Sequence, residues 1–251
     1  MLTDRRYAYQ GSHMSFPPGV KWLLIINIGI FLLYVLADQV GIGDVFLTFT
    51  LIPELVLKHG AVWQLVTYMF LHAGVFHILF NMLSLWMFGS DLEREWGTKR
   101  FLSYYFFCGV CAGLCSVALN ALVGSMRTRT IGSSGAVYGL LLAFGLLYPN
   151  RTIFFNFLFP IKAKYFVMIV GAVAFLGTLG SDGNVSHIAH LGGMLFGYLY
   201  LKSTALRGIE SSLGPSQLRQ AYKAWQLRRA KRKFQVYARK HHRHGQGPWV
   251  N

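Results

Sequence analysis

Ser134 lies where a polar loop runs into an apolar stretch, in residues 132–139 (GSSGAVYG). About 15 apolar or small residues follow it, or about 23 Å of helix, which is short for a hydrocarbon core of about 30 Å. Such a helix would begin below the outer membrane surface and leave Ser134 in a water-accessible depression. Its free N–H groups would stabilise a developing oxyanion. Taken alone, a serine N-cap followed by packing glycines explains these residues at least as well.

His190 opens the last apolar stretch, in residues 186–197 (SHIAHLGGMLFG). Glycines follow it at a spacing of four, and the stretch after Ser134 has matching small residues, so the two helices could approach closely. These glycines are Gly135, Gly139, Gly193 and Gly197. Such an approach could bring the imidazole to within about 3 Å of the Ser134 hydroxyl, as a nucleophile and its general base require. The paired arrangement favours catalysis over a structural role for a lone histidine.

His77 and Asn81 form a third polar group near the start of an apolar stretch. Their spacing of four puts them on one helical face. Both side chains can donate hydrogen bonds, so they are candidates to hold the oxyanion of a tetrahedral intermediate. The alternative is a polar contact between membrane helices, which is common.

The composition indicates which environment must position these residues. Of 251 residues, 54% are hydrophobic and 13% are charged, whereas a soluble domain carries about a quarter charged residues. Long uncharged stretches predict an all-α polytopic membrane protein, a bundle of six transmembrane helices. The predicted segments are residues 21–37, 75–88, 101–123, 134–148, 165–179 and 188–201. The long connection 38–74 is aromatic and sparsely charged, which predicts short helices in the outer interface around residues 46–49 and 63–70.

The positive charges predict an orientation with both termini in the cytoplasm. Among the shorter segments, nine Lys or Arg fall on the proposed inner side and three on the outer side. The net charge is +15, and twelve of the 24 Lys and Arg lie between Lys202 and Arg243. This basic tail predicts contact with anionic lipid headgroups rather than with nucleic acid. Residues 217–240 predict an amphipathic helix there, although a flexible tail has nearly equal support.

The expected organisation is a cytoplasmic segment 1–20, a six-helix domain 21–203 and a basic cytoplasmic tail 204–251. Residues 11–14 (GSHM) resemble a remnant of an expression vector. Three cysteines on one apolar segment, Cys108, Cys111 and Cys115, are expected to be buried packing residues. The histidines at 241, 242 and 244 belong to a tail end that is expected to be disordered. We expect no metal and no cofactor, and the sequence indicates no particular oligomeric state.

Three motifs in order give the chain a resemblance to the rhomboid family of intramembrane proteases. They are residues 77–81 (HILFN), residues 132–138 with Gly132, Ser134, Gly135 and Tyr138, and residues 189–197 with His190, Gly193 and Gly197. Each motif alone is weak, but all three at matching helix ends are specific. The resemblance covers about residues 21–201 and does not extend to the tail.

The resemblance implies a role for each motif residue. Ser134 would be the nucleophile and His190 the general base, in a dyad without an acidic third member. His77 and Asn81 would stabilise the oxyanion together with the Ser134 backbone N–H. Tyr138 would pack against the catalytic imidazole. Because Ser133 and His187 lie close to the dyad in sequence, local reasoning leaves them open, and the resemblance selects Ser134 and His190.

Two further positions are compared with the family pattern. Glu93 and Gly97 match the turn that follows the second membrane helix, which implies a structural role. Trp63-Gln64 stands where many members carry Trp-Arg, so the role of that pair is in doubt.

The implied reaction is hydrolysis of a peptide bond in a transmembrane protein through an acyl-enzyme. The loops 124–130 and 180–186 are expected to form the rim of the water-filled cavity. A catalytically silent relative that binds membrane helices is the first alternative, and a transporter is the second. The compact six-helix form without a targeting extension predicts the inner membrane of a bacterium.

Overall fold

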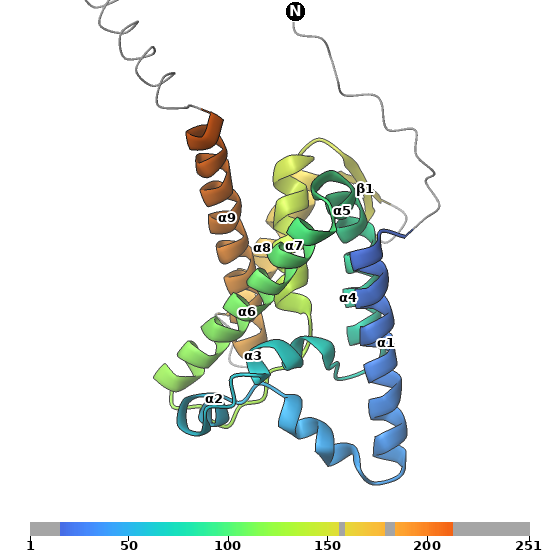
Figure 1. The fold of residues 1–251 in the computed structure, drawn as a ribbon, viewed down its shortest axis with the longest axis vertical. Coiled ribbons are helices and arrows are strands. Elements are labelled where there is room, and N and C mark those ends of the chain that lie inside the picture. The colour runs from blue at the N-terminus through green and yellow to red at the C-terminus, as the bar shows by residue number, and fades with distance from the viewer. Residues whose placement is uncertain (1–15, 156–158, 179–183, 213–251) are drawn as a thin grey trace, which may run out of the picture. The chain divides into compact units, whose positions relative to one another are not determined.

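The computed structural model describes residues 16–155, 159–178 and 184–212. The described residues are mostly helical, with one two-stranded sheet (Figure 1). The chain divides into two compact units, Met1–Leu201 and Lys202–Asn251, and all of the site residues lie in the first. The elements are α1 (Pro18–Gln39), η1 (Gly43–Phe49), α2 (Pro53–His59), α3 (Gln64–Thr67), η2 (Tyr68–Phe70), α4 (Val75–Ser84), η3 (Leu85–Gly89), α5 (Ser90–Trp96), α6 (Thr98–Leu122), α7 (Ser134–Leu147), β1 (Thr152–Phe155), β2 (Phe159–Lys162), α8 (Ala163–Gly177) and α9 (Asn184–Ser212).

Three helices in the described part of the chain are long and apolar enough to cross a membrane. They are Pro18–Gln39, Val75–Trp96 and Thr98–Leu122. Two shorter apolar helices, Ser134–Leu147 and Ala163–Gly177, follow. Hydropathy predicts that the second apolar segment ends at residue 88. In the structure the helix continues through a π-turn (η3) and α5 to Trp96. The charged residues after 88 conceal that continuation, because they lower the mean hydropathy although Leu92 is fully buried in the core.

The connection between α1 and α4 contains the short helices that its aromatic sequence predicts. Gln64 is fully buried in this connection and organises it. Its side chain accepts a hydrogen bond from the Ile52 N–H at 3.0 Å and donates one to the Thr48 carbonyl at 3.1 Å. The Trp63 indole N–H also donates to the Thr48 carbonyl, at 3.2 Å. Trp63 and Gln64 therefore join two parts of the connecting segment through the Thr48 carbonyl.

Small residues allow other helices to pack closely around α7, the helix that begins at Ser134. It contacts α4, α6 and α8. A Cβ atom on Gly193 of α9 would overlap the carbonyl oxygen of Gly135, and one on Gly139 would lie 3.3 Å from the Gly193 carbonyl oxygen. The expected meeting of the two glycine-bearing helices is thus present at these residues. Gly197 differs, because it lies against Tyr104 of α6, where a Cβ would come within 2.5 Å of the hydroxyl.

The three cysteines of α6 are free. Cys108 is buried against Gly139, as expected for a packing residue. Cys111 and Cys115 are only partly buried, so the prediction of burial is wrong for these two. Cys115 still contacts Gly192 of α9.

The strands β1 and β2 form an antiparallel hairpin between α7 and α8, in a register that pairs Thr152 with Lys162 and Phe155 with Phe159. The prediction of an all-α fold is therefore incomplete, because it omits this hairpin. Four-residue strands next to two apolar helices are too short to show a periodicity of their own. The predicted tail helix 217–240 and the histidines at 241–244 lie outside the described residues.

Candidate active site

Ser134 and His190 form a close contact between two helices that are 56 residues apart in sequence. Ser134 is the first residue of α7, and its hydroxyl oxygen lies 2.7 Å from Nε2 of His190 in α9. Gly135 directly follows Ser134, and Gly193 lies about one turn after His190, so the close backbone approach of these two glycines brings the two side chains together. A larger residue at either position would separate the two side chains. A hydroxyl at this distance from an imidazole nitrogen can be activated as a nucleophile.

The imidazole of His190 is oriented by an aromatic ring. Tyr138 lies one turn after Ser134 in α7, and its ring stacks on His190 with centroids 4.1 Å apart and an interplanar angle of 5°. Nδ1 of His190 is buried and has no hydrogen-bond partner among the described residues. If Nε2 accepts the hydroxyl proton, Nδ1 carries the ring proton in the neutral tautomer. Packing, not a carboxylate, therefore determines how this ring lies.

His77 presents a hydrogen-bond donor to the same region. The Ala73 N–H donates to Nδ1 of His77 at 3.2 Å, so the neutral ring carries its proton on Nε2. A Cβ on Gly132 would lie 2.7 Å from that Nε2 atom. Gly132 also has φ of +110°, so both the backbone conformation and the approach of His77 require glycine. The amide of Asn81 donates to the His77 carbonyl at 2.9 Å, which leaves its second N–H for other partners.

These side chains surround one cavity of about 400 Å³. Its polar lining consists of His77, Asn81, Ser84, Ser134, Tyr138 and His190. The apolar lining comes from α4, α7 and α8 and includes Phe76, Phe80 and Phe166. The cavity thus combines a hydroxyl, an imidazole and further hydrogen-bond donors with an apolar wall, an arrangement that could support acyl transfer on a largely apolar substrate.

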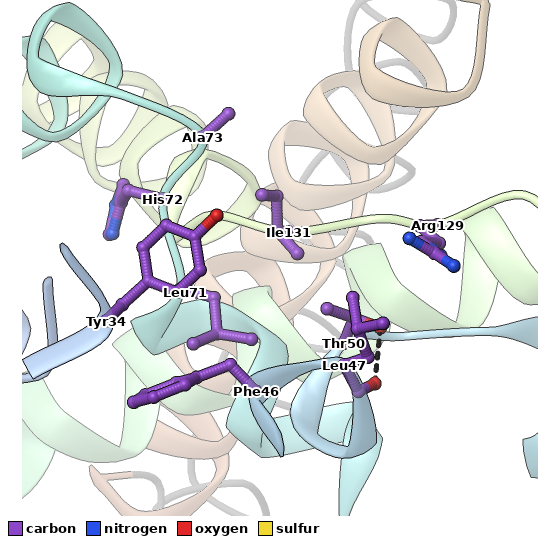
Figure 2. Close-up of a pocket in the computed structure, with 9 residues that line it drawn as sticks. All are labelled: Tyr34, Phe46, Leu47, Thr50, Leu71, His72, Ala73, Arg129 and Ile131. Carbon is purple, nitrogen blue, oxygen red and sulfur yellow. Dashed lines mark hydrogen bonds between the residues drawn. The ribbon is translucent and has the colours of Figure 1, made fainter. Parts of the chain in front are cut away.

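His72 is a residue of this region that the sequence analysis did not single out. Its side chain is 3% exposed, Nε2 lies 3.4 Å from the Ser133 hydroxyl, and its ring meets His77 edge-on at 5.0 Å. It also lines a second pocket of about 290 Å³, between α1, the connection and residues 129–131 (Figure 2). A histidine five residues before His77 is outside the helical pattern of residues 77–81, so its proximity depends on the turn at residues 71–74.

Burial and the neighbouring His77 lower the pKa of His72 from 6.5 to about 4. Between these values the unfolded state binds more protons than the folded state, so the free energy of unfolding decreases as the pH falls through this window. The difference corresponds to a loss on the order of 3 kcal/mol by about pH 4. We expect His72→Gln, which does not titrate, to flatten the pH dependence of the thermal midpoint in detergent. His59→Gln, at an exposed histidine, is the control, and an equal flattening by both variants would contradict this assignment.

His187 is close to the dyad without contacting Ser134. Its ring lies edge-on to His190 with centroids 6.0 Å apart. Its other contact is with Gly177 of α8, where a Cβ would lie 2.5 Å from the imidazole. The structure therefore separates two histidines that the local sequence left equivalent: His190 contacts Ser134, whereas His187 packs between α9 and α8.

The loop 124–130 is attached to the connection after α1. Leu51 and Thr130 form an isolated antiparallel bridge, and Arg127 pairs with Glu54 at 3.0 Å. Ser116 and Thr130 are joined by a buried hydrogen bond of 2.9 Å, which fixes the loop to α6. Most of the other predicted rim segment, residues 180–186, lies outside the described residues.

Comparison with known proteins identifies relatives across this part of the chain. A family model described as Rhomboid domain matches residues 59–206. RHOMBOID-like protein 1 of Arabidopsis thaliana is 36% identical over 147 residues, which are 58% of this chain and 35% of that protein. Rhomboid protease GluP of Bacillus subtilis is 32% identical over 145 residues, 57% of this chain and 26% of that protein. Putative rhomboid protease YdcA of the same species is 34% identical over 144 residues, 57% of this chain and 67% of that protein. The alignments thus span only about a third of the plant protein and a quarter of GluP.

Proposed function

This chain belongs to the rhomboid family, and from that premise we propose that it is an intramembrane serine endopeptidase that uses Ser134 and His190 as a catalytic dyad. Its substrates are membrane proteins, cut in or near a transmembrane segment. The observation that carries the proposal is the 2.7 Å contact between Ser134 Oγ and His190 Nε2. Relatives named as proteases support the same reaction class.

In the proposed reaction, Nε2 of His190 takes the Ser134 proton as Oγ attacks the scissile carbonyl. The resulting imidazolium then donates that proton to the leaving amine, and an acyl-enzyme remains on Ser134. A water molecule, deprotonated by His190, releases the second product and restores the dyad. Stacking on Tyr138 keeps the ring in the required plane through these steps.

The oxyanion of each tetrahedral intermediate accepts hydrogen bonds from three donors. They are Nε2–H of His77, the free amide N–H of Asn81 and the backbone N–H of Ser134. The last of these has no intrahelical partner because it belongs to the first turn of α7. Donors in such fixed positions stabilise charge that develops only in the transition state.

We expect His77→Ala to lower kcat by about 10²-fold with little change in KM, because one preorganised oxyanion donor is lost. The measurement is steady-state cleavage of a transmembrane substrate in detergent. Ser84→Ala, in the same cavity, is the matched control and should stay within about twofold of the wild type. A rise in KM alone would assign His77 to substrate binding instead.

The proposed setting is a six-helix membrane bundle with both termini in the cytoplasm, most simply the inner membrane of a bacterium. The three long apolar helices, the two shorter ones and α9 supply the six segments. In this arrangement α7, with only 14 residues, begins below the outer surface and holds Ser134 in a depression that water reaches from outside. The basic tail then faces anionic lipid headgroups in the cytoplasm.

Labelling by a fluorophosphonate, combined with cleavage of a model transmembrane substrate, tests the proposed function. The wild type should be labelled and should cleave, and Ser134→Ala should do neither. Ser133→Ala is the matched control, since it removes the adjacent hydroxyl and should leave labelling in place. Failure of the wild type to be labelled or to cleave any of several substrates would indicate a silent relative that binds membrane helices.

A further inference from the structure

The β1–β2 hairpin is fixed to the ends of the two helices that it connects. The Ala163 N–H donates to the Arg151 carbonyl at 2.8 Å, and the Lys164 N–H donates to the Pro149 carbonyl at 3.2 Å. Both bonds close the base of the hairpin onto the first turn of α8. The strands pair with one another, so their inward-facing backbone groups are already satisfied.

The hairpin lies against the helices rather than projecting away from them. Ile153 and Ile161 face one another in the register. Ile153 belongs to a buried cluster with Phe144 and Val167, and the partly buried Ile161 packs against it. Phe144 lies one turn before the end of α7, and Val167 one turn after the start of α8. The strand residues beyond this contact therefore lie alongside the apolar helices.

Two large rings on the strands are more than half exposed. Phe154 of β1 is 59% exposed and Phe159 of β2 is 66% exposed. Phenylalanine rings are favourable where acyl chains cover them. Each outer edge of a two-stranded hairpin keeps unpaired N–H and C=O groups, so the hydrated headgroup zone, rather than the hydrocarbon core, suits it.

Cations without acidic partners gather at the base of the same hairpin. Lys162 and Lys164 have no carboxylate within ion-pair distance among the described residues. Lys164 lies 5.0 Å from the centre of the Tyr165 ring. Arg151 differs from the two lysines, because its guanidinium pairs with Asp91 of α5 at 2.8 Å. The two lysines are therefore the charges that remain for an external anion.

The lipid-facing surface of α8 begins directly after these lysines. Tyr165, Met168 and Ile169 are exposed, and they continue the apolar surface from the hairpin along the helix. Acyl chains that cover this surface must have their headgroups near the start of α8, beside residues 162–164. A negative headgroup would complement the two ammonium groups there.

We propose that the hairpin base, formed by Lys162 and Lys164, binds the phosphate headgroup of an anionic phospholipid, while Phe154, which lies on the same face of the hairpin as Lys162, contacts its acyl chains. The first two amides of α8 are used by the hairpin base, so the lysine side chains hold the anion. This surface is separate from the basic tail and does not depend on the dyad. Lipid bound at this surface would anchor the end of α7 and the start of α8, at the opposite end of α7 from Ser134.

Site-specific crosslinking in the full chain tests this surface. Phe154 is replaced by p-benzoylphenylalanine, and the protein is reconstituted in vesicles of phosphatidylcholine with a minor fraction of phosphatidylglycerol. We expect adducts enriched in phosphatidylglycerol relative to its share of the bilayer. The preference should fall about fivefold for each lysine that is lost in Lys162→Gln, Lys164→Gln and the double variant, and it should weaken with salt.

Two controls distinguish lipid binding at this surface from a general attraction of anionic lipid to the basic tail. The tail is the same in every variant. Lys99→Gln removes another exposed lysine near a helix start and should not change the adducts at position 154. The same probe at Phe175, exposed near the other end of α8, should show lipid adducts that do not respond to Lys162→Gln. Adducts without headgroup preference, or adducts to protein in place of lipid, would overturn the proposal, and either result can be obtained with the inactive Ser134→Ala protein.

Discussion

Ser134→Ala and His190→Ala should each lower kcat for a transmembrane substrate by about 10⁴-fold or more, and the double variant should be no slower than either single variant. In the proposed mechanism the two side chains act as one unit through a single 2.7 Å contact. Removing either therefore abolishes covalent catalysis, and the second substitution has nothing left to remove. What activity persists would come from the oxyanion donors and substrate binding alone.

Single-turnover cleavage of a purified substrate in detergent measures this effect, with circular dichroism to show that each variant is folded. His187→Ala is the matched control for His190→Ala, because it removes an imidazole three residues away that does not contact Ser134. We expect it to retain far more activity. If the losses of the two single variants multiplied in the double variant, Ser134 and His190 would be acting independently, and the dyad would be wrong.

Glu93→Ala should lower the free energy of unfolding by roughly 3–5 kcal/mol. Glu93 is 3% exposed, and its carboxylate accepts the N–H groups of Gly19 and Val20 at 2.7 Å each. It also accepts the Thr98 hydroxyl at 2.6 Å. Alanine would leave the first amides of α1 buried without acceptors, and each such group costs about 1–3 kcal/mol. The start of α1 would then separate from α5.

Glu93→Gln should fall between wild type and Glu93→Ala, because its amide keeps one acceptor but turns an N–H group toward a backbone N–H. Glu95→Ala, two residues further along α5 and exposed, is the matched control and should cost less than about 1 kcal/mol. Steric trapping or thermal unfolding in detergent gives the comparison. An effect of Glu93→Ala no larger than that of Glu95→Ala would show that the two backbone hydrogen bonds contribute little.

The membrane class and the site motifs are readable from the sequence because both are local properties. Long runs without charge predict helices in lipid, and the described helices begin and end within a few residues of most predicted bounds. Two helices are exceptions, because the second runs on to Trp96 and the last runs on to Ser212, well past the predicted end at residue 201. The β1–β2 hairpin is a third exception, since its pairing joins residues that only a turn brings together.

The partners of the site residues depend on contacts between distant segments. His187 and His190 both lie near the start of α9, and only the rotation of that helix against α7 directs His190 toward Ser134. The protonated nitrogen of His77 follows from the Ala73 N–H, and the place of His72 follows from a turn that no periodicity predicts.

The sequence alone predicts a membrane environment and shows which residue types are available for chemistry, because hydropathy and motif spacing are properties of single segments. Only the tertiary structure decided which side chains meet. Gly193 meets Gly135, whereas Gly197 meets Tyr104 of a different helix, although both glycines belong to one spacing pattern. The physical reason is that a helix of spaced glycines can approach any neighbour closely, and the packing of the whole bundle selects the neighbour.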